Sequence, residues 1–242
     1  MKILKTIIRE FIFSLTAIIL KTNFRVTVKG LENIPSDSKV LIVANHASYL
    51  DVFLVGTALF HQLINIRWVI SAANYRIKAL QWFYWVYQVI VAEKGTVGRV
   101  IDTLNQKKWV MIFPEGDAKW VVQKDNEPPK KLGKGAAAIA LSTGVTILPI
   151  GITGADRALA PISFKVDKRH PITVTIGKVF HFDAVAQEKM SSAMLEEKVT
   201  EIMVRVNDLV EGETHILPVM DDENDPFLDA PIIETTLECH PT

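Results

Sequence analysis

Short runs of apolar residues alternate with segments of helical periodicity along most of the chain. Runs of this kind are typical of strands that are covered on both faces. They are Val40–Ala44, Arg67–Ser71, Val89–Ala92, Trp109–Phe113 and Thr146–Ile150, and the alternating stretch Phe24–Lys29 indicates one more strand. Helical periodicity covers Leu50–Leu63, Ile77–Tyr87, Val97–Gln106, Gly135–Ser142 and Ser191–Leu209. The pattern therefore predicts an α/β fold with a mostly parallel mixed sheet flanked by helices.

The first segment of the chain is apolar but carries charges. Its longest uncharged run, Phe11–Leu20, is about half of the ~20 residues that a membrane-spanning helix needs. We expect residues 1–22 to form an amphipathic helix that lies in a membrane interface, with Lys2, Lys5 and Arg9 facing lipid headgroups. A helix packed on its own domain is the alternative. The aromatic segment Ala79–Ala92 leaves the same choice open, because Trp and Tyr favour both interfaces and cores.

The remainder of the chain divides into one domain and a tail. We expect the α/β domain to cover residues 23–211. Residues 212–242 combine four prolines with an acidic run at Asp221, Asp222, Glu223 and Asp225, which predicts an extended or disordered acidic tail.

Composition excludes several classes of protein. Hydrophobic residues make up 49% of the 242 residues, which is ample for a buried core. Lys and Arg (27) balance Asp and Glu (27), whereas a nucleic-acid binder would need a basic excess. The single cysteine, Cys239, can form neither an intrachain disulfide nor a two-cysteine metal site, and it fits a reducing, cytosol-facing location.

Polar residues follow the run Val40–Ala44 at once, with Asn45, His46, Ser48 and Asp51 close together. Ligands of open parallel sheets bind outside the carboxyl ends of the strands. Histidine suits general-base chemistry near neutral pH, and a neighbouring carboxylate can fix its tautomer. On one continuous helix, residues five apart are turned by about 140° from each other. The pair therefore requires His46 in a loop and Asp51 in the first turns of a helix. A helix cap beside an incidental histidine is the alternative.

Two further stretches could contribute to a site. Phe113-Pro114-Glu115-Gly116 follows another buried strand at the same edge of the predicted sheet. The stretch from Pro128 to Gly135 carries Lys130, Lys131 and Lys134 before a helix, where free backbone amides beside a lysine can bind an anion. A flexible turn is the alternative for this basic stretch.

In combination, these motifs resemble the signatures of the glycerolipid acyltransferases, whose best-known members are the 1-acylglycerol-3-phosphate acyltransferases. Asn45-His46-x-Ser48-x-x-Asp51 is similar to the first signature, and Phe113–Gly116 is similar to the start of the third. Val145–Ile150 resembles the fourth, a strand with proline near its end, and Gln88–Lys94 lies where the second falls. The resemblance runs from about Gly30 to Gly151.

The resemblance implies that His46 is the general base and that Asp51 orients and supports it. His46 would take the proton of an acceptor hydroxyl as this attacks an acyl thioester. No acyl-enzyme is needed, so Ser48 is not a nucleophile, and no metal or bound cofactor is implied. The candidate substrate-binding residues are Asn45, Ser48, Lys94, Glu115, Gly116, Lys134 and Pro149.

Two departures from the family pattern concern the phosphate of the acceptor. Lys94 stands where the second signature has arginine, and Asp117-Ala118 stand where the third has Thr-Arg. Arginine binds phosphate through two parallel N–H groups, which lysine does not have, and the negative charge of aspartate repels phosphate. Lys94, Lys119, Lys134 and Arg99 are candidate replacements. The acceptor is then lysophosphatidic acid, another lysolipid, or an alcohol or amine without phosphate.

We therefore expect an O-acyltransferase that takes its acyl group from acyl-CoA or acyl-carrier protein and works as a peripheral protein on the cytosolic face of a membrane. Its expected partners are membrane lipids and the acyl donor, and nucleic acid is not among them. A thioesterase or hydrolase that uses the same pair on water is one alternative. A non-catalytic lipid-binding relative is another.

Overall fold

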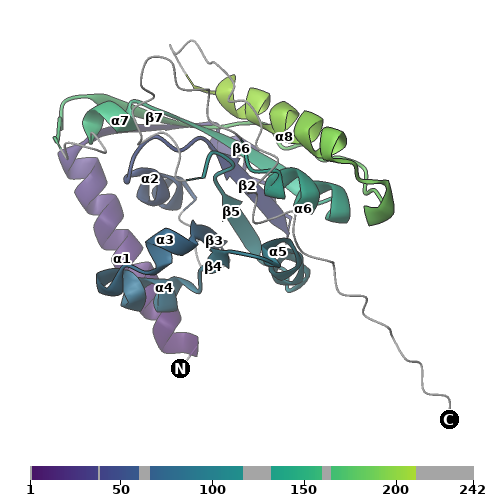
Figure 1. Cartoon of the computed structure of the whole chain (residues 1–242). Helices are drawn as coiled ribbons and strands as arrows, with labels where there is room; N and C mark the ends of the chain where they lie inside the picture. The colour runs from purple at the N-terminus through teal and green to yellow at the C-terminus, as the bar shows by residue number, and fades with distance from the viewer. Residues whose placement is uncertain (1, 38, 60–65, 117–131, 160–164, 211–242) are drawn as a thin grey trace.

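The predicted apolar runs pair into one sheet. The computed structural model describes residues 2–37, 39–59, 66–116, 132–159 and 165–210, and these build a seven-stranded sheet in the order β1-β7-β6-β2-β5-β3-β4 (Figure 1). The strands are β1 (Arg25–Lys29), β2 (Val40–Ala44), β3 (Ile66–Ser71), β4 (Ile90–Ala92), β5 (Trp109–Ile112), β6 (Thr146–Thr153) and β7 (Pro171–Ile176).

Most neighbouring strands run parallel. β2 pairs in parallel with both β5 and β6, β5 with β3, and β3 with β4. β7 runs antiparallel to β6 and carries β1 parallel to itself. The predicted mostly parallel mixed sheet is thus confirmed. β7 itself was not predicted, although its buried residues alternate with half-buried ones in the period that indicated β1.

β2 is the most deeply buried strand of this sheet. All five of its residues have no exposed surface, because β5 and β6 flank it and helices cover both faces. The carboxyl ends of β2, β5, β6, β3 and β4 therefore meet at one edge of the sheet, which we call the carboxyl edge. His46 follows β2 at this edge.

Helices cover both faces of the sheet (Figure 1). One face packs against α1 (Lys2–Asn23), α2 (Asp51–Ala58) and α4 (Gln81–Tyr87), and the other against α5 (Thr96–Asn105), α6 (Gly135–Thr143) and α8 (Ser192–Asn207). Two short helices that were not predicted, α3 (Ala72–Tyr75) and α7 (Ala155–Ala158), follow β3 and β6. The segment Ile77–Tyr87, predicted as one helix, forms a 3₁₀ turn (Lys78–Leu80) followed by α4. The predicted helix Leu50–Leu63 corresponds to α2, and its residues 60–63 lie outside the described residues.

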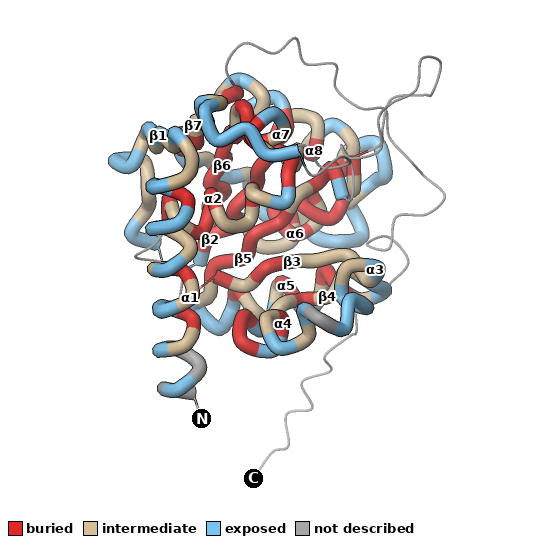
Figure 2. Tube along the Cα trace, turned by 90° about the vertical axis from the view of Figure 1, so that its left-hand side faces the viewer, coloured by how far each residue is buried: buried red, intermediate tan, exposed pale blue. Residues whose placement is uncertain are grey.

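α1 has one buried and one exposed face. Phe13 and Leu20 are buried in the core, and Phe13 stacks on Trp68. The opposite face leaves large apolar side chains exposed, and these are Leu4, Ile7, Phe11, Leu15, Ile18 and Ile19. Figure 2 shows exposed positions in pale blue along α1. One face of α1 therefore packs on the domain and the other faces outward, and the location of this helix in a membrane interface stays a prediction.

Arg9 does not face outward as the sequence suggested. Its side chain is only 4% exposed, because Arg9 precedes Phe13 by one turn and shares its buried face. The Tyr87 hydroxyl donates a hydrogen bond to the Arg9 carbonyl oxygen (3.4 Å), and burial lowers the pKa of the Arg9 guanidinium. Burial also lowers the pKa of nearby Arg67 to about 10. The side chains of Lys2 and Lys5 lie outside the described residues.

Two predictions about the ends of the chain have different outcomes. In the ranges that the structure describes, no helix combines the length and apolarity needed to cross a bilayer. α8 ends at Asn207, and the predicted tail 212–242 with Cys239 lies outside the described residues.

The packing of α1 on α2 depends on a glycine. A Cβ atom added at Gly56 would lie 1.9 Å from Cε1 of Phe13, so Gly56→Ala must displace α1. We expect a loss of about 1–3 kcal/mol in the free energy of unfolding, measured by urea denaturation. Gly98 in α5 is the matched control, since no atom lies within 4 Å of its added Cβ. Gly98→Ala should stabilise by about 0.5–1 kcal/mol. Equal effects of the two substitutions would contradict this account of the α1–α2 contact.

Candidate active site

His46 and Asp51 meet at the carboxyl edge. The loop after β2 carries His46, and α2 begins at Asp51, which is the arrangement that the spacing required. Nδ1 of His46 lies 2.8 Å from Oδ2 of Asp51. The same oxygen accepts the backbone N–H groups of Ala47 (2.7 Å) and Ser48 (2.8 Å). One buried carboxylate oxygen therefore holds both the imidazole and the loop that carries it.

The hydrogen bond determines which ring nitrogen of His46 can act as a base. A carboxylate oxygen only accepts, so Nδ1 carries the hydrogen and Nε2 of the neutral ring keeps a lone pair. The Phe113 ring stacks on the imidazole with centroids 4.2 Å apart and planes 19° apart. The His46 side chain is 13% exposed and that of Asp51 is fully buried. The ring is thus oriented by Asp51 and Phe113 and stays in contact with solvent.

Glu115 lies beside this pair. Its Oε2 accepts the backbone N–H of His46 at 3.3 Å, and the residue is only 8% exposed. Gly116 follows in a left-handed conformation (φ 63°), which closes a tight turn with its N–H bonded to the Phe113 carbonyl oxygen (3.0 Å). The two motifs are therefore brought together at one edge, as expected. Asp117, Ala118, Lys119, Lys130 and Lys131 lie outside the described residues.

Asn45 is turned into the fold and not toward a ligand. Its Nδ2 donates to the Ile152 carbonyl oxygen (2.9 Å), and its Oδ1 accepts the Ile152 N–H (2.7 Å). The residue is 1% exposed. A side chain bonded in this way ties the His46 loop to β6, and the expected contact of Asn45 with substrate stays a prediction.

Ser48 is likewise bonded within the fold, and its expected contact with substrate stays a prediction. Its hydroxyl donates to the Leu159 carbonyl oxygen (3.1 Å) and accepts the Leu50 N–H (3.3 Å), and the residue is fully buried. Buried hydroxyl groups are normally bonded within the fold. Ser48 thus connects the loop after β2 to the segment after α7.

Lys134 does not present its charge to an anion at the start of α6. Its Nζ lies 2.8 Å from Oε1 of Glu196 and donates to the Ser192 hydroxyl (2.7 Å), and the side chain is fully buried. The first turns of α8 cover this position. The structure thus shows Lys134 in a buried ion pair between α6 and α8, and its expected role in binding substrate stays a prediction.

The two other predicted residues, Pro149 and Lys94, lie at different depths. Pro149 is buried within β6 beside Gly177. On one side of Pro149, Ile150 pairs with Ile176, and on the other side Ile147 pairs with Phe180, so the register changes by one residue. A one-residue shift of this kind is a β-bulge, which tolerates the missing N–H of proline.

Lys94 is exposed in the turn after β4, at the carboxyl edge. β4 is three strands from β2, so Lys94 lies on the order of 14 Å from the His46 strand.

Arg99 does not offer a free fork to phosphate. Its guanidinium pairs with Oε1 of Glu93 (2.7 Å) and donates to the Val91 carbonyl oxygen (2.9 Å).

Among the described residues, no group of three or more His, Cys, Asp and Glu side chains is arranged to hold a metal ion.

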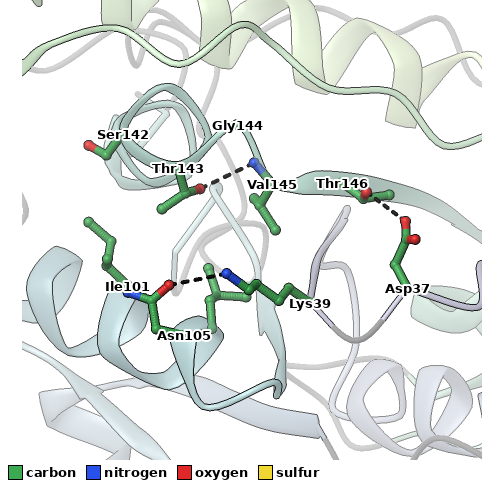
Figure 3. Close-up of a pocket in the computed structure, with 10 residues that line it drawn as sticks. Asp37, Lys39, Ile101, Asn105, Ser142, Thr143, Gly144, Val145 and Thr146 are labelled. Atoms are coloured by element: carbon green, nitrogen blue, oxygen red, sulfur yellow. Dashed lines mark hydrogen bonds between the residues drawn. The ribbon is translucent and has the colours of Figure 1, made fainter.

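A cavity of about 510 Å³ lies at the opposite edge of the sheet (Figure 3). Its walls come from the loop before β2, the start of β6 and the last turns of α5 and α6. Asp37 accepts a hydrogen bond from Thr146 (2.7 Å), and Lys39 donates one to Asn105 (3.3 Å). None of the predicted site residues lines this cavity, so it is separate from the His46–Asp51 pair.

Comparison with known proteins identifies the family of the chain. A family model described as Acyltransferase matches residues 25–153, which is 129 of the 242 residues. The chain belongs to the acyltransferase family. The matched region contains His46, Asp51 and Glu115, and it includes every strand except β7.

Curated relatives of the chain include several enzymes with the same name. The chain is 29% identical over 165 residues to a 1-acyl-sn-glycerol-3-phosphate acyltransferase of Chlamydomonas reinhardtii, covering 63% of this chain and 45% of that one. It is 25% identical over 169 residues to a chloroplastic enzyme of the same name from Arabidopsis thaliana (65% and 44%). It is 26% identical over 187 residues to the Saccharomyces cerevisiae protein of that name (74% and 58%). The resemblance to glycerolipid acyltransferases is confirmed, and the chain spans about half the length of these relatives.

A solved structure supports the same fold. The crystal structure of a 1-acyl-sn-glycerophosphate acyltransferase from Thermotoga maritima matches with a TM-score of 0.59 and 21% identity, over 83% of this chain and 79% of that one. This likeness confirms the α/β architecture of the acyltransferase family in this chain.

The Asn45 contact predicts a measurable contribution to stability. Asn45→Ala would leave the N–H and the carbonyl of Ile152 without their partner in a buried position, which should cost about 2–3 kcal/mol of unfolding free energy in urea denaturation. Asn33→Ala is the matched control, because Asn33 makes one part-buried bond to the Ile176 carbonyl oxygen (2.9 Å). It should cost about 1 kcal/mol or less. If Asn45→Ala costs no more than Asn33→Ala, Asn45 does not hold the loop.

Proposed function

We propose that this chain is an O-acyltransferase that moves a fatty acyl group from the thioester of CoA or acyl-carrier protein to the hydroxyl of a lysolipid, with 1-acylglycerol-3-phosphate as the first candidate. The observation that carries the proposal is the 2.8 Å contact between His46 and Asp51 at the carboxyl edge, in a chain of the acyltransferase family. The names of the three relatives support the acceptor.

In the proposed reaction, Nε2 of His46 removes the proton of the acceptor hydroxyl. The oxygen then bonds to the thioester carbonyl carbon, and the tetrahedral adduct collapses as the carbon–sulfur bond breaks. The departing thiolate takes the proton back from the imidazolium, so one thioester and one alcohol give one ester and one thiol. Asp51 supports this cycle because its negative charge lies against Nδ1 while the ring is positive. General-base catalysis of this kind contributes about 10²–10⁴-fold in rate.

Glu115 supports the site in two ways under this proposal. Its Oε2 holds the backbone of His46, so the carboxylate fixes the position from which the imidazole acts. Glu115 and Gly116 belong to the turn after β5 that contacts the His46 loop, which supports the role in substrate binding that the family resemblance implies.

The identity of the acceptor depends on how a phosphate would be bound. Of the four replacements that the sequence suggested, Lys134 and Arg99 are engaged within the fold and Lys119 lies outside the described residues, which leaves Lys94 as an exposed cation at the same edge. A lysine binds phosphate as a point charge without the bidentate geometry of arginine. This difference supports testing lysolipids without a terminal phosphate, and simple alcohols or amines, beside lysophosphatidic acid.

We also propose that α1 attaches the protein to a membrane as a peripheral protein on the cytosolic side. The exposed apolar face of α1 supports attachment, since such a face is favoured at the boundary between headgroups and acyl chains. Trp82 and Trp85 of α4 are more than half exposed and suit the same boundary. Attachment would bring the site to acceptors that are themselves lipids.

Acyl transfer should depend on both members of the pair. With labelled acyl-CoA or acyl-carrier protein and a panel of lysolipids and alcohols, we expect His46→Ala and Asp51→Asn each to lower transfer by about 10²-fold or more. Circular dichroism would check that both variants fold. His181→Ala is the matched control, because His181 is exposed in the segment after β7, and it should retain full activity.

Each other outcome of this experiment has a definite meaning. Undiminished transfer by His46→Ala would remove the proposed mechanism. Release of free fatty acid without any acceptor would assign the pair to a thioesterase or hydrolase. Lipid binding without transfer, unaffected by His46→Ala, would indicate a non-catalytic relative.

Membrane attachment should depend on the outer face of α1. Deleting the helix would be a poor test, because Phe13 and Leu20 belong to the core. We expect the double variant Phe11→Ser and Ile18→Ser to lower vesicle binding by about tenfold or more in a sedimentation assay. The matched control, Val179→Ser with Val204→Ser, changes two exposed apolar residues elsewhere and should bind as the unaltered protein does. Equal binding by all three would rule out this face as the attachment site.

A further inference from the structure

Cationic side chains gather where α1 ends and β1 and β7 begin. Lys21 and Arg25 come from the first of these junctions, Arg157 comes from α7, and Lys165, Lys168 and Arg169 come from the segment that leads into β7. All six are exposed. We call these six residues the basic rim.

Three contacts hold the basic rim together. Arg25 pairs in the sheet with Pro171, so β1 starts beside the start of β7. Nζ of Lys168 donates to Oδ1 of Asn23 at 2.7 Å, which ties the segment before β7 to the end of α1. The Asp167 N–H donates to the Ala158 carbonyl oxygen (2.9 Å), which ties the same segment to α7. Figures 1 and 2 both show α7 and the end of α1 at this corner of the molecule.

The charge of this corner is strongly unbalanced. In residues 21–25, 155–159 and 165–170, six Lys and Arg side chains face two carboxylates, Asp156 and Asp167, which gives +6 − 2 = +4. The whole chain has a net charge of zero. Positive charge is therefore concentrated here and compensated elsewhere, which favours a negatively charged partner at this corner.

The basic rim lies at the same edge of the sheet as His46. β7 runs antiparallel to β6, so its first residues lie where β6 ends. The Ser48 hydroxyl bonds the loop of His46 to Leu159, and Leu159 forms an isolated bridge with Val166 inside the basic rim. Whatever binds the basic rim is therefore close to the opening of the candidate active site.

Apolar surface continues directly from the basic rim. Ile18 (59% exposed) and Ile19 (47% exposed) lie on the last turns of α1, just before Lys21, and Val166 is 49% exposed between Lys165 and Asp167. A surface that is cationic and apolar in one stretch matches an anionic bilayer, whose charged headgroups overlie acyl chains. An acidic carrier protein would explain the charges but not the apolar face that runs back along the whole of α1.

We propose that the basic rim binds the headgroups of anionic phospholipids and so orients the attached protein with its carboxyl edge toward the membrane. The proposal rests on the proposed membrane attachment by α1 and adds to it the kind of lipid and the direction in which the site faces. These headgroup contacts come from the end of α1 and the start of β7, whereas Arg9, which the sequence suggested for this role, is buried.

Binding to two kinds of vesicle tests this proposal. The protein carries His46→Ala in every sample, so the result does not depend on catalysis. One set of vesicles is pure phosphatidylcholine, and the other is equal parts phosphatidylcholine and phosphatidylglycerol. The rim variant has Lys21→Gln, Lys168→Gln and Arg169→Gln. The matched control has Lys29→Gln, Lys107→Gln and Lys178→Gln, three exposed lysines at the opposite edge.

On anionic vesicles, each rim cation that is removed should weaken binding by about fivefold, or about a hundredfold for three. The control should stay within about twofold of the parent, and all forms should bind pure phosphatidylcholine alike. Unchanged binding of the rim variant, or equal weakening in rim variant and control, would overturn the proposal. In an active His46 background, a rim variant that still binds vesicles but loses transfer from acyl-carrier protein alone would assign the basic rim to the carrier. Loss of vesicle binding with intact transfer to a dispersed acceptor would leave the proposed function standing.

Discussion

One oxygen atom of Asp51 organises the candidate site. It accepts the imidazole Nδ1–H and two backbone N–H groups, so the loop after β2 folds around it before α2 continues. A negative charge at the start of a helix is also favoured by the unpaired N–H groups there. The motif spacing follows from this geometry, because the loop must be long enough to turn and short enough for His46 to reach back. Asn45, Ser48 and Glu115 then fix the same loop to β6, to the segment after α7 and to β5.

The sequence predicted the sheet well because strands covered on both faces must be apolar at every position. β2, β5 and β6 are of this kind, and their runs stand out among polar neighbours. β7 was missed although Ile172, Val174 and Ile176 alternate with threonines, which is the period-2 pattern that indicated β1. Short helices such as α3 and α7 carry too few turns for a periodic pattern.

The site was predictable in its centre and less so around it. The angle between residues on a helix gave the condition under which His46 and Asp51 can meet, with His46 in a loop and Asp51 in the first turns of a helix, and the structure fulfils this condition. The hydrogen-bond partners of Asn45, Ser48 and Lys134 could not be predicted from the sequence. A polar side chain near a reactive one can bond either to a ligand or to the protein itself, and the residue type does not decide between the two. Only the fold reveals that Ile152, Leu159 and Glu196 are their partners. The stacking of Phe113 on His46 was missed as well, although Phe113 was part of a recognised motif.

The double character of α1 has a thermodynamic consequence. Phe13 inserts against Gly56 so closely that the helix cannot lift from the sheet without opening the core, while its outer side chains face solvent. A bilayer that takes up those side chains would bind the native chain more tightly than the unfolded chain. By mass action, this difference in binding free energy would add to the stability of the domain. If α1 attaches the protein to a bilayer as proposed, detachment and opening of the core are therefore coupled equilibria.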